Sequence, residues 1–377
     1  MNNYNIEQRL DEMIKTCRKG LFLSIAILFL WASVWAQVDS AAKRARSQMD
    51  AAAKKAVVDT IAELLEDNYV YPETGEEMGR LIRQRLAAGA YDSFTRPASL
   101  ASRLQGDLRE ISHDLHLRVR YDPDTAVALL RGGGDDAELH QRRVERERRV
   151  NFGFERIERL AGNVGYLDLR FFADTAYAQD TAAAAMAVLA GSDAVIFDLR
   201  SNGGGSPRMV QFLCSYFFGP EPVHLNSLYW RPSDRTDEFW TLKELPGKRY
   251  PDTDLYILTS QRTFSGAEEF TYNMKNLKRA TIVGETTGGG AHPVNQKPVN
   301  DQFVLIVPVG RAINPISKTN WEGVGVEPDV EVSRADALAN AHLMALKKIH
   351  ERTEDEDWKR QLQRYIGQIE RDLAPKK

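Results

Sequence analysis

One serine of this 377-residue chain stands where it could act as a nucleophile. Ser265 follows the apolar run Leu255–Leu258, which predicts a strand, and precedes an amphipathic pattern, which predicts a helix. A serine at such a junction has helix N-terminal amides beside its hydroxyl. Ser265 and Glu268 also match the S-x-x-E capping box, a common helix start. The choice between catalysis and capping therefore depends on the rest of the chain.

A glycine-rich turn is the first supporting feature. The segment Asp198–Gly205 ends in three consecutive glycines and directly follows Ala194–Phe197, an apolar run that predicts a buried strand. Glycines let backbone amides approach a ligand closely. Free amides in such a turn can stabilise a developing oxyanion. A plain strand-to-helix turn would explain one glycine easily and three poorly.

Histidine is the usual base for a serine nucleophile because its pKa lies near neutrality. The chain has seven histidines, and His113 and His116 lie three residues apart, so spacing does not choose between them. His292 follows Gly288–Gly290 and is the strongest rival base. A carboxylate that orients the base could come from the acidic, glycine-containing segment Glu322–Asp329.

Composition and charge limit the classes of function. With 43% hydrophobic and 27% charged residues, the chain suits a globular protein of one large or two ordinary domains. A net charge of −3 and a pI of about 6.2 give no indication of a nucleic-acid partner. The sequence has no His-x-x-x-His helix pair, cysteine cluster or phosphate-binding loop, so we expect no metal and no cofactor.

The first 36 residues have the layout of a signal peptide. A basic flank precedes the apolar run Leu21–Trp31, and small residues lead to a cleavage point before Gln37. An uncleaved N-terminal anchor is the alternative, because the apolar run is close to the lower limit for spanning a bilayer. Either way we expect an exported protein, in the bacterial periplasm or secreted. Cys214, then the sole remaining cysteine, lies in an apolar run and is expected to be a buried hydrophobe.

The patterning along the chain predicts several structural units. Apolar residues at helical spacing predict a small helical domain, and Gly132–Asp136 predicts a linker after it. From Val164 onward, strands and helices alternate, which predicts an α/β core with parallel pairing. We divide the chain into a signal peptide (1–36), an N-terminal helical domain with linker (37–150), an α/β catalytic core (151–335) and C-terminal helices (336–377).

Taken together, these features resemble the tail-specific (C-terminal processing) serine peptidase superfamily. The resemblance is greatest to the branch shared by the tricorn protease core and the interphotoreceptor retinoid-binding protein, and it extends from about residue 55 to residue 335. No single segment is specific, but the combination is. The matching segments are Asp114–Leu117, Asp198–Gly205, Thr263–Phe270, Val283–Gly290 and Glu322–Asp329.

The resemblance implies a fold and a set of roles. It implies an α/β core of the crotonase and Clp-protease type, capped by a helical domain. Ser265 would be the nucleophile, and the amides of Gly204 and Gly266 would form the oxyanion hole. His116 would be the base, and Glu322 its supporting carboxylate.

Three departures from the family pattern narrow this expectation. The tail-specific branch uses a serine–lysine dyad, but Gly290 occupies the position of that lysine here, so a serine–histidine–glutamate arrangement is expected. Leu115 stands where the tricorn branch has a polar residue before its histidine. The segment between His116 and Val164 is too short for a peptide-binding PDZ domain.

Two functions follow from the resemblance. The first is a serine peptidase, of endopeptidase or C-terminal processing type, that hydrolyses a peptide or protein substrate through an acyl-enzyme. The alternative is a catalytically inactive relative that binds an apolar ligand such as a retinoid or a fatty acid, since fold does not fix function. The intact serine–histidine–carboxylate set favours the peptidase.

Overall fold

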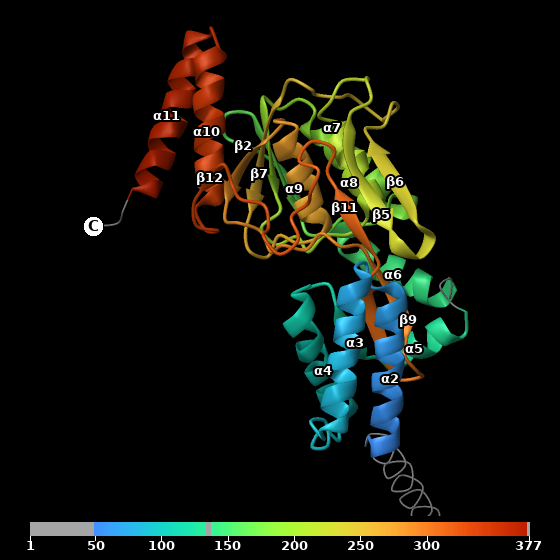
Figure 1. The fold of residues 1–377 in the computed structure, drawn as a ribbon. Coiled ribbons are helices and arrows are strands. Elements are labelled where there is room, and N and C mark those ends of the chain that lie inside the picture. Colours follow the sequence, from blue (N-terminus) through green and yellow to red (C-terminus); the bar gives the residue numbers. More distant parts are fainter. Residues whose placement is uncertain (1–48, 133–136, 375–377) are drawn as a thin grey trace, which may run out of the picture.

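The computed structural model describes residues 49–132 and 137–374. The signal peptide expected at 1–36 and most of the expected linker lie outside the described residues. In Figure 1 a helical region lies at one end of an α/β body, and a pair of helices at the C-terminal end packs on another side of that body. Within the two described ranges, no helix is both long and apolar enough to cross a membrane.

The N-terminal helical region has the three helices that the sequence predicts. Proline at the first position of the second and third helices suits a helix start, because its missing N–H would have no partner there. The buried faces of the three helices share one hydrophobic core. The helices are α2 (Ala51–Asn68), α3 (Pro72–Ala87) and α4 (Pro97–Ser112).

A small antiparallel sheet joins this helical region to the rest of the chain. Its order is β1–β10–β9, from β1 (Arg118–Tyr121), β10 (Phe303–Pro308) and β9 (Val294–Pro298). Phe303 and Leu305 of β10 are fully buried in the core of α2, α3 and α4. The helical region thus packs on residues that the sequence division assigns to the α/β core.

The α/β body is built on a six-stranded sheet. The parallel pairing expected from the alternation of strands and helices is present from β3 to β12, and β2 is antiparallel to β3. The spatial order is β12 (Val330–Glu331), β8 (Thr281–Gly284), β7 (Asp254–Thr259), β4 (Ala194–Asp198), β3 (Val164–Leu169) and β2 (Phe154–Leu160).

Helices cover both faces of this sheet, and a second antiparallel sheet flanks it (Figure 1). One face packs against α7 (Thr175–Leu189), α8 (Pro207–Ser215) and α9 (Gly266–Asn276), and the other against α10 (Ala337–Arg352) and α11 (Glu356–Leu373). The flanking sheet has the order β11–β5–β6, from β11 (Gly310–Ile313), β5 (His224–Trp230) and β6 (Arg235–Trp240). Between β1 and β2 lie α5 (Pro123–Leu130) and α6 (Ala137–Arg149).

The adjacency of β4 and β7 positions the candidate site. Parallel neighbours end at the same edge of a sheet, so the turn after β4 and the turn after β7 meet there. Two hydrogen bonds join the turns: Phe264 N–H donates to the Asn202 carbonyl at 3.0 Å, and the Thr263 hydroxyl donates to the Leu199 carbonyl at 2.8 Å. The glycine-rich turn therefore lies beside Ser265, although about sixty residues separate them in the sequence.

Candidate active site

Ser265 occupies a strained position between β7 and α9. Its backbone angles are φ 56° and ψ −124°, outside the regions that residues with a side chain normally adopt. A sharp strand-to-helix turn of this kind exposes a nucleophilic hydroxyl at the end of a sheet. Such strain costs on the order of 1–3 kcal/mol and is found mainly at functional sites.

Glu268 holds this turn against a second loop. Its side chain is fully buried, and Oε2 accepts the Ser265 N–H at 2.8 Å, which is half of the capping box expected from the sequence. Oε2 also accepts the Gly290 N–H at 2.8 Å, while Oε1 accepts the Gly289 N–H at 2.6 Å and the Thr287 hydroxyl at 2.5 Å. The capping residue therefore also fixes the glycine loop that precedes His292.

The two glycines expected to form the oxyanion hole lie next to Ser265. A Cβ on Gly204 would come within 2.6 Å of the Ser265 Cβ and 2.7 Å of the Gly266 nitrogen, so only glycine fits there. Gly266 is the first residue of α9, where backbone N–H groups have no partner inside the helix. The Gly204 N–H, in contrast, donates to the Asn202 side-chain oxygen at 2.8 Å.

His116 lies in the same cavity as Ser265, a hollow of about 240 Å³. Its ring packs on Phe264, with ring centroids 4.6 Å apart, and Gly290 leaves it room, since a Cβ there would approach the ring to 2.7 Å. The buried Nδ1 has no hydrogen-bond partner among the described residues. Burial lowers the pKa of His116 to about 4, against the raising effect of the nearby Asp114 carboxylate.

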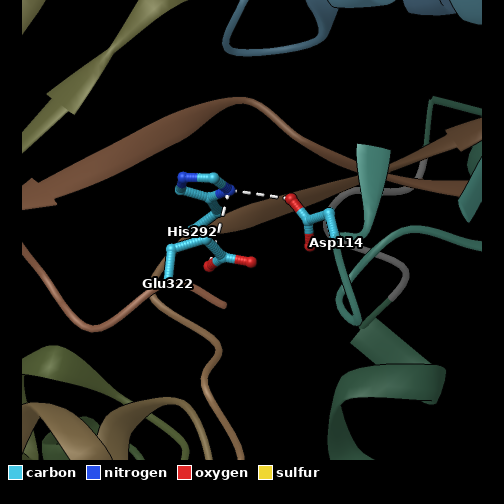
Figure 2. A group of neighbouring side chains, drawn as sticks. All are labelled: Asp114, His292 and Glu322. Atoms are coloured by element: carbon cyan, nitrogen blue, oxygen red, sulfur yellow. Dashed lines mark hydrogen bonds and ion pairs between the residues drawn. The ribbon is translucent and has the colours of Figure 1, made fainter. Parts of the chain in front are cut away.

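His292 also lines this cavity, and two carboxylates meet it (Figure 2). Its Nδ1 lies 2.7 Å from Asp114 Oδ2 and 3.5 Å from Glu322 Oε2. Nε2 points away from both carboxylates in Figure 2, and it is buried without a hydrogen-bond partner in the described part of the chain. A carboxylate on one imidazole nitrogen fixes the ring and leaves the other nitrogen available.

The two carboxylates differ in their affinity for protons. Burial raises the pKa of Asp114, but the hydrogen bond with His292 and the backbone N–H of His116 outweigh it and hold the pKa below its usual value. Burial and the nearby charge of Asp114 raise the pKa of Glu322 to about 7. Of the two, Glu322 is therefore the first to take up a proton as the pH falls.

Asp114, His292 and Glu322 offer donor atoms within 4.8 Å of one another, a set that could in principle bind a metal. The distances do not fit tetrahedral zinc. Two ligands about 2.0–2.1 Å from such an ion lie roughly 3.3 Å apart, whereas Nδ1 and Oδ2 are 2.7 Å apart. This is the length of a charge-assisted hydrogen bond.

The structure brings some of the expected residues together and separates others. Ser265, Gly266 and His116 line one cavity, together with the rival base His292. His113 is exposed, in a left-handed conformation at the end of α4, and is not among the lining residues. Glu322 lies 3.5 Å from the His292 ring and accepts the Ala291 N–H at 2.5 Å. Among the described residues, no hydrogen bond or ion pair joins Glu322 to His116.

Two acidic residues of the site were not singled out by the sequence analysis. Asp114 binds both histidines, through the His116 backbone and the His292 ring. Asp114 lies two residues before the candidate base His116, and this proximity in the sequence could have identified it. Glu269 lines the cavity, but it directly follows Glu268 on a predicted helix, and nothing in the sequence distinguishes it from a solvent-facing acid.

The site combines a serine on a strained strand-to-helix turn, two histidines in the same cavity and the N-terminus of a helix beside the serine. This is the arrangement expected of a serine-type peptidase. The model for "Peptidase family S41" matches residues 163–332, and the model for "N-terminal domain of Peptidase_S41 in eukaryotic IRBP" matches residues 47–147. Together the two models span well over half of the chain. The chain belongs to peptidase family S41, as the sequence resemblance indicates.

Solved structures share the fold at low sequence identity. A lipoprotein from Streptococcus agalactiae (14% identity, TM-score 0.53) and a structure assigned as a peptidase from Parabacteroides merdae (16%, 0.52) each match 78% of this chain and 96% of their own. The photosystem II D1 C-terminal processing protease matches at 23% identity and a TM-score of 0.38, over 46% of this chain. The chain spans 43% of that protein's length.

The strain at Ser265 predicts an unusual order of stability. Glycine adopts a positive φ without penalty, so Ser265→Gly relieves backbone strain of order 1–3 kcal/mol. It also lowers the free energy of unfolding by about 0.4–1 kcal/mol, because glycine makes the unfolded chain more flexible. We expect Ser265→Gly to be more stable than Ser265→Ala by about 1 kcal/mol in urea unfolding.

The matched control is Ser201, which has no positive φ. There, glycine should be less stable than alanine. A Ser265→Ala variant as stable as Ser265→Gly would contradict the argument from strain.

Proposed function

We propose that this protein hydrolyses peptide bonds, with Ser265 as the nucleophile. The Ser265 hydroxyl attacks the carbonyl carbon of the scissile bond while His116 accepts its proton. The same proton passes to the departing amine as the carbon–nitrogen bond breaks, and water then releases the acyl group from the serine. The observation that carries this proposal is the strained turn at Ser265, which opens into a cavity shared with His116 and the first amide of α9.

The oxyanion of the intermediate would be held by backbone amides. Gly266 offers one N–H at the start of α9, where the positive end of the helix dipole adds to its effect. Gly204 is the second proposed donor. Its N–H now donates to the Asn202 side-chain oxygen, so this bond would be shared with the oxyanion as charge develops.

The proposed role of Glu322 is to support the site through the loop that carries His292. Its Oε2 accepts the Ala291 N–H and lies 3.5 Å from the His292 ring. Asp114 complements it by accepting from the His116 backbone and the His292 ring. The carboxylates thus support the base by fixing both histidine-bearing segments.

The carrier alternative finds little support in the cavity. Its volume of about 240 Å³ is below the range of roughly 300–1,000 Å³ usual for small-molecule sites. A retinoid or fatty-acid chain would also have to pack its apolar surface against the Glu269 carboxylate, which is an unfavourable neighbour for an apolar group.

Labelling with a fluorophosphonate, a probe that reacts with activated serines, tests the proposal. We expect the purified protein to be labelled and to cleave unfolded peptides, and Ser265→Ala to do neither. Because a general base contributes about 10²–10⁴-fold, His116→Gln should slow labelling by that factor. His113→Asn, which alters an exposed histidine three residues away, should leave the rate unchanged.

Two results would change the assignment. If His292→Gln abolishes labelling while His116→Gln retains it, the base is His292. If the folded parent protein is not labelled at all, the peptidase proposal fails.

The low pKa of His116 predicts the pH dependence of labelling. The imidazole accepts a proton only when it is neutral, which holds above its pKa of about 4. The rate constant for labelling should therefore stay level from pH 8 to about pH 5 and fall only as the pH approaches 4. A half-loss near pH 6.5, the ordinary value for histidine, would contradict the role of His116.

We also propose that the protein is exported, on the basis of the basic flank and apolar run in residues 1–36. Expression of the full chain in a bacterium with a periplasm should yield a mature protein that begins at Gln37 and is released by osmotic shock. Mass spectrometry of the recovered protein measures this. An intact N-terminus in the cytosolic fraction would rule the proposal out.

A further inference from the structure

Glu269 lies in the active-site cavity and has no part in the proposed chemistry. It is the residue after Glu268, one position further along α9, and only 5% of its surface is exposed. Glu268 accepts four hydrogen bonds from the loops around it, whereas Glu269 lines the hollow that also contains Ser265 and Gly266. A second acid is thus placed beside the nucleophile for a reason other than holding the loops.

No cation of the described residues pairs with the Glu269 carboxylate. The polar group that interacts with it is the side-chain amide of Asn226 on β5, which is fully buried. Both polar atoms of that amide lack a hydrogen bond of normal length. The thiol of Cys214, also buried, is close enough for its pKa to be raised by Glu269 after the larger effect of burial. Both of these neighbours of the carboxylate are neutral groups.

Much of the rest of the cavity wall is apolar. Its lining includes Pro207, Leu228, Trp230, Ala312 and Trp321. Burial in this setting raises the pKa of Glu269 to about 7. A buried carboxylate without a partner is costly, and an arriving cation removes that cost. A narrow apolar pocket with one acid inside it matches a side chain that has an apolar stem and a cationic end.

We propose that this cavity is a substrate side-chain pocket, and that Glu269 selects a lysine or arginine side chain next to the scissile bond. The aliphatic stem packs against the two tryptophans and Leu228, and the ammonium or guanidinium group donates hydrogen bonds to the Glu269 carboxylate. The buried side-chain amide of Asn226 interacts with the same carboxylate from outside the cavity lining. This inference rests on the proposed peptidase function and adds a substrate class to it.

Matched peptides that differ in one group test the proposal. Arginine is compared with citrulline, which has nearly the same shape without the charge, and lysine with norleucine. A charge-assisted hydrogen bond in a buried site is expected to favour the charged peptide by about 10–100-fold in kcat/KM. Glu269→Gln should abolish this preference and leave the fluorophosphonate labelling of Ser265 intact.

Further variants separate a role of Glu269 in specificity from a structural role. Glu327→Gln makes the same substitution at an exposed acid and should keep the preference. Glu269→Leu should raise the urea midpoint at pH 8 while it abolishes the preference, because it removes a buried and unpaired charge. A purely structural glutamate would give a lower midpoint. If Glu269→Gln does not fold, Glu269→Asp retains the charge and should still favour arginine over citrulline.

The outcomes distinguish this inference from the function on which it rests. If Ser265 is labelled but the parent protein cleaves citrulline and norleucine peptides as fast as the charged ones, the basic pocket is wrong and the peptidase stands. Retention of the preference in Glu269→Gln would also overturn the pocket. If Ser265 is not labelled and no peptide is cleaved, the peptidase proposal itself has failed.

Discussion

The site depends on the buried carboxylate of Glu268. A carboxylate accepts about four hydrogen bonds, and this one has all four, from Ser265, Thr287, Gly289 and Gly290. The first donor belongs to the nucleophile turn and the others to the loop between β8 and β9. One side chain therefore sets the distance between the serine and the loop that packs against His116. The hydrogen bonds of Glu268 also explain how the strained backbone of Ser265 is retained, because they hold the turn in this conformation.

A second constraint joins the helical region to the chemistry. Asp114 follows α4 and is almost completely buried. It accepts from the His116 backbone at 2.8 Å and the His292 ring at 2.7 Å, and the Tyr69 hydroxyl at the end of α2 donates to it at 3.3 Å. The candidate base and its neighbour are thus positioned by the N-terminal helices as much as by the sheet. The helical region is an integral part of the site, which forms where that region meets the α/β body.

The sequence predicts the parts of this arrangement that depend on local pattern. The strands β3, β4, β7 and β8 and the helices that follow the first three of them were expected from apolar patterning. The parallel pairing of these strands followed from the alternation of strands and helices. The hairpin of β5 and β6 was not predicted, and it carries Leu228 and Trp230 of the cavity wall. The contact of Asp114 with His292 joins residues 178 positions apart. Such a contact depends on packing rather than on spacing, so no local pattern could have revealed it.

The consecutive acids Glu268 and Glu269 show which structural roles the sequence alone does not predict. Helical geometry turns neighbouring residues by about 100°, so the two carboxylates face different surroundings, and only the fold decides what those surroundings are. Glu268 meets four donors that the protein supplies. Glu269 lines a hollow with a largely apolar wall, and none of the residues that the structure describes supplies a cation for it. Burial of an unpaired acid lowers stability without any gain within the fold itself. The loss of stability caused by burying Glu269 is offset when a ligand supplies the missing cation. Glu269 therefore tells us about the substrate, whereas Glu268 tells us about the scaffold.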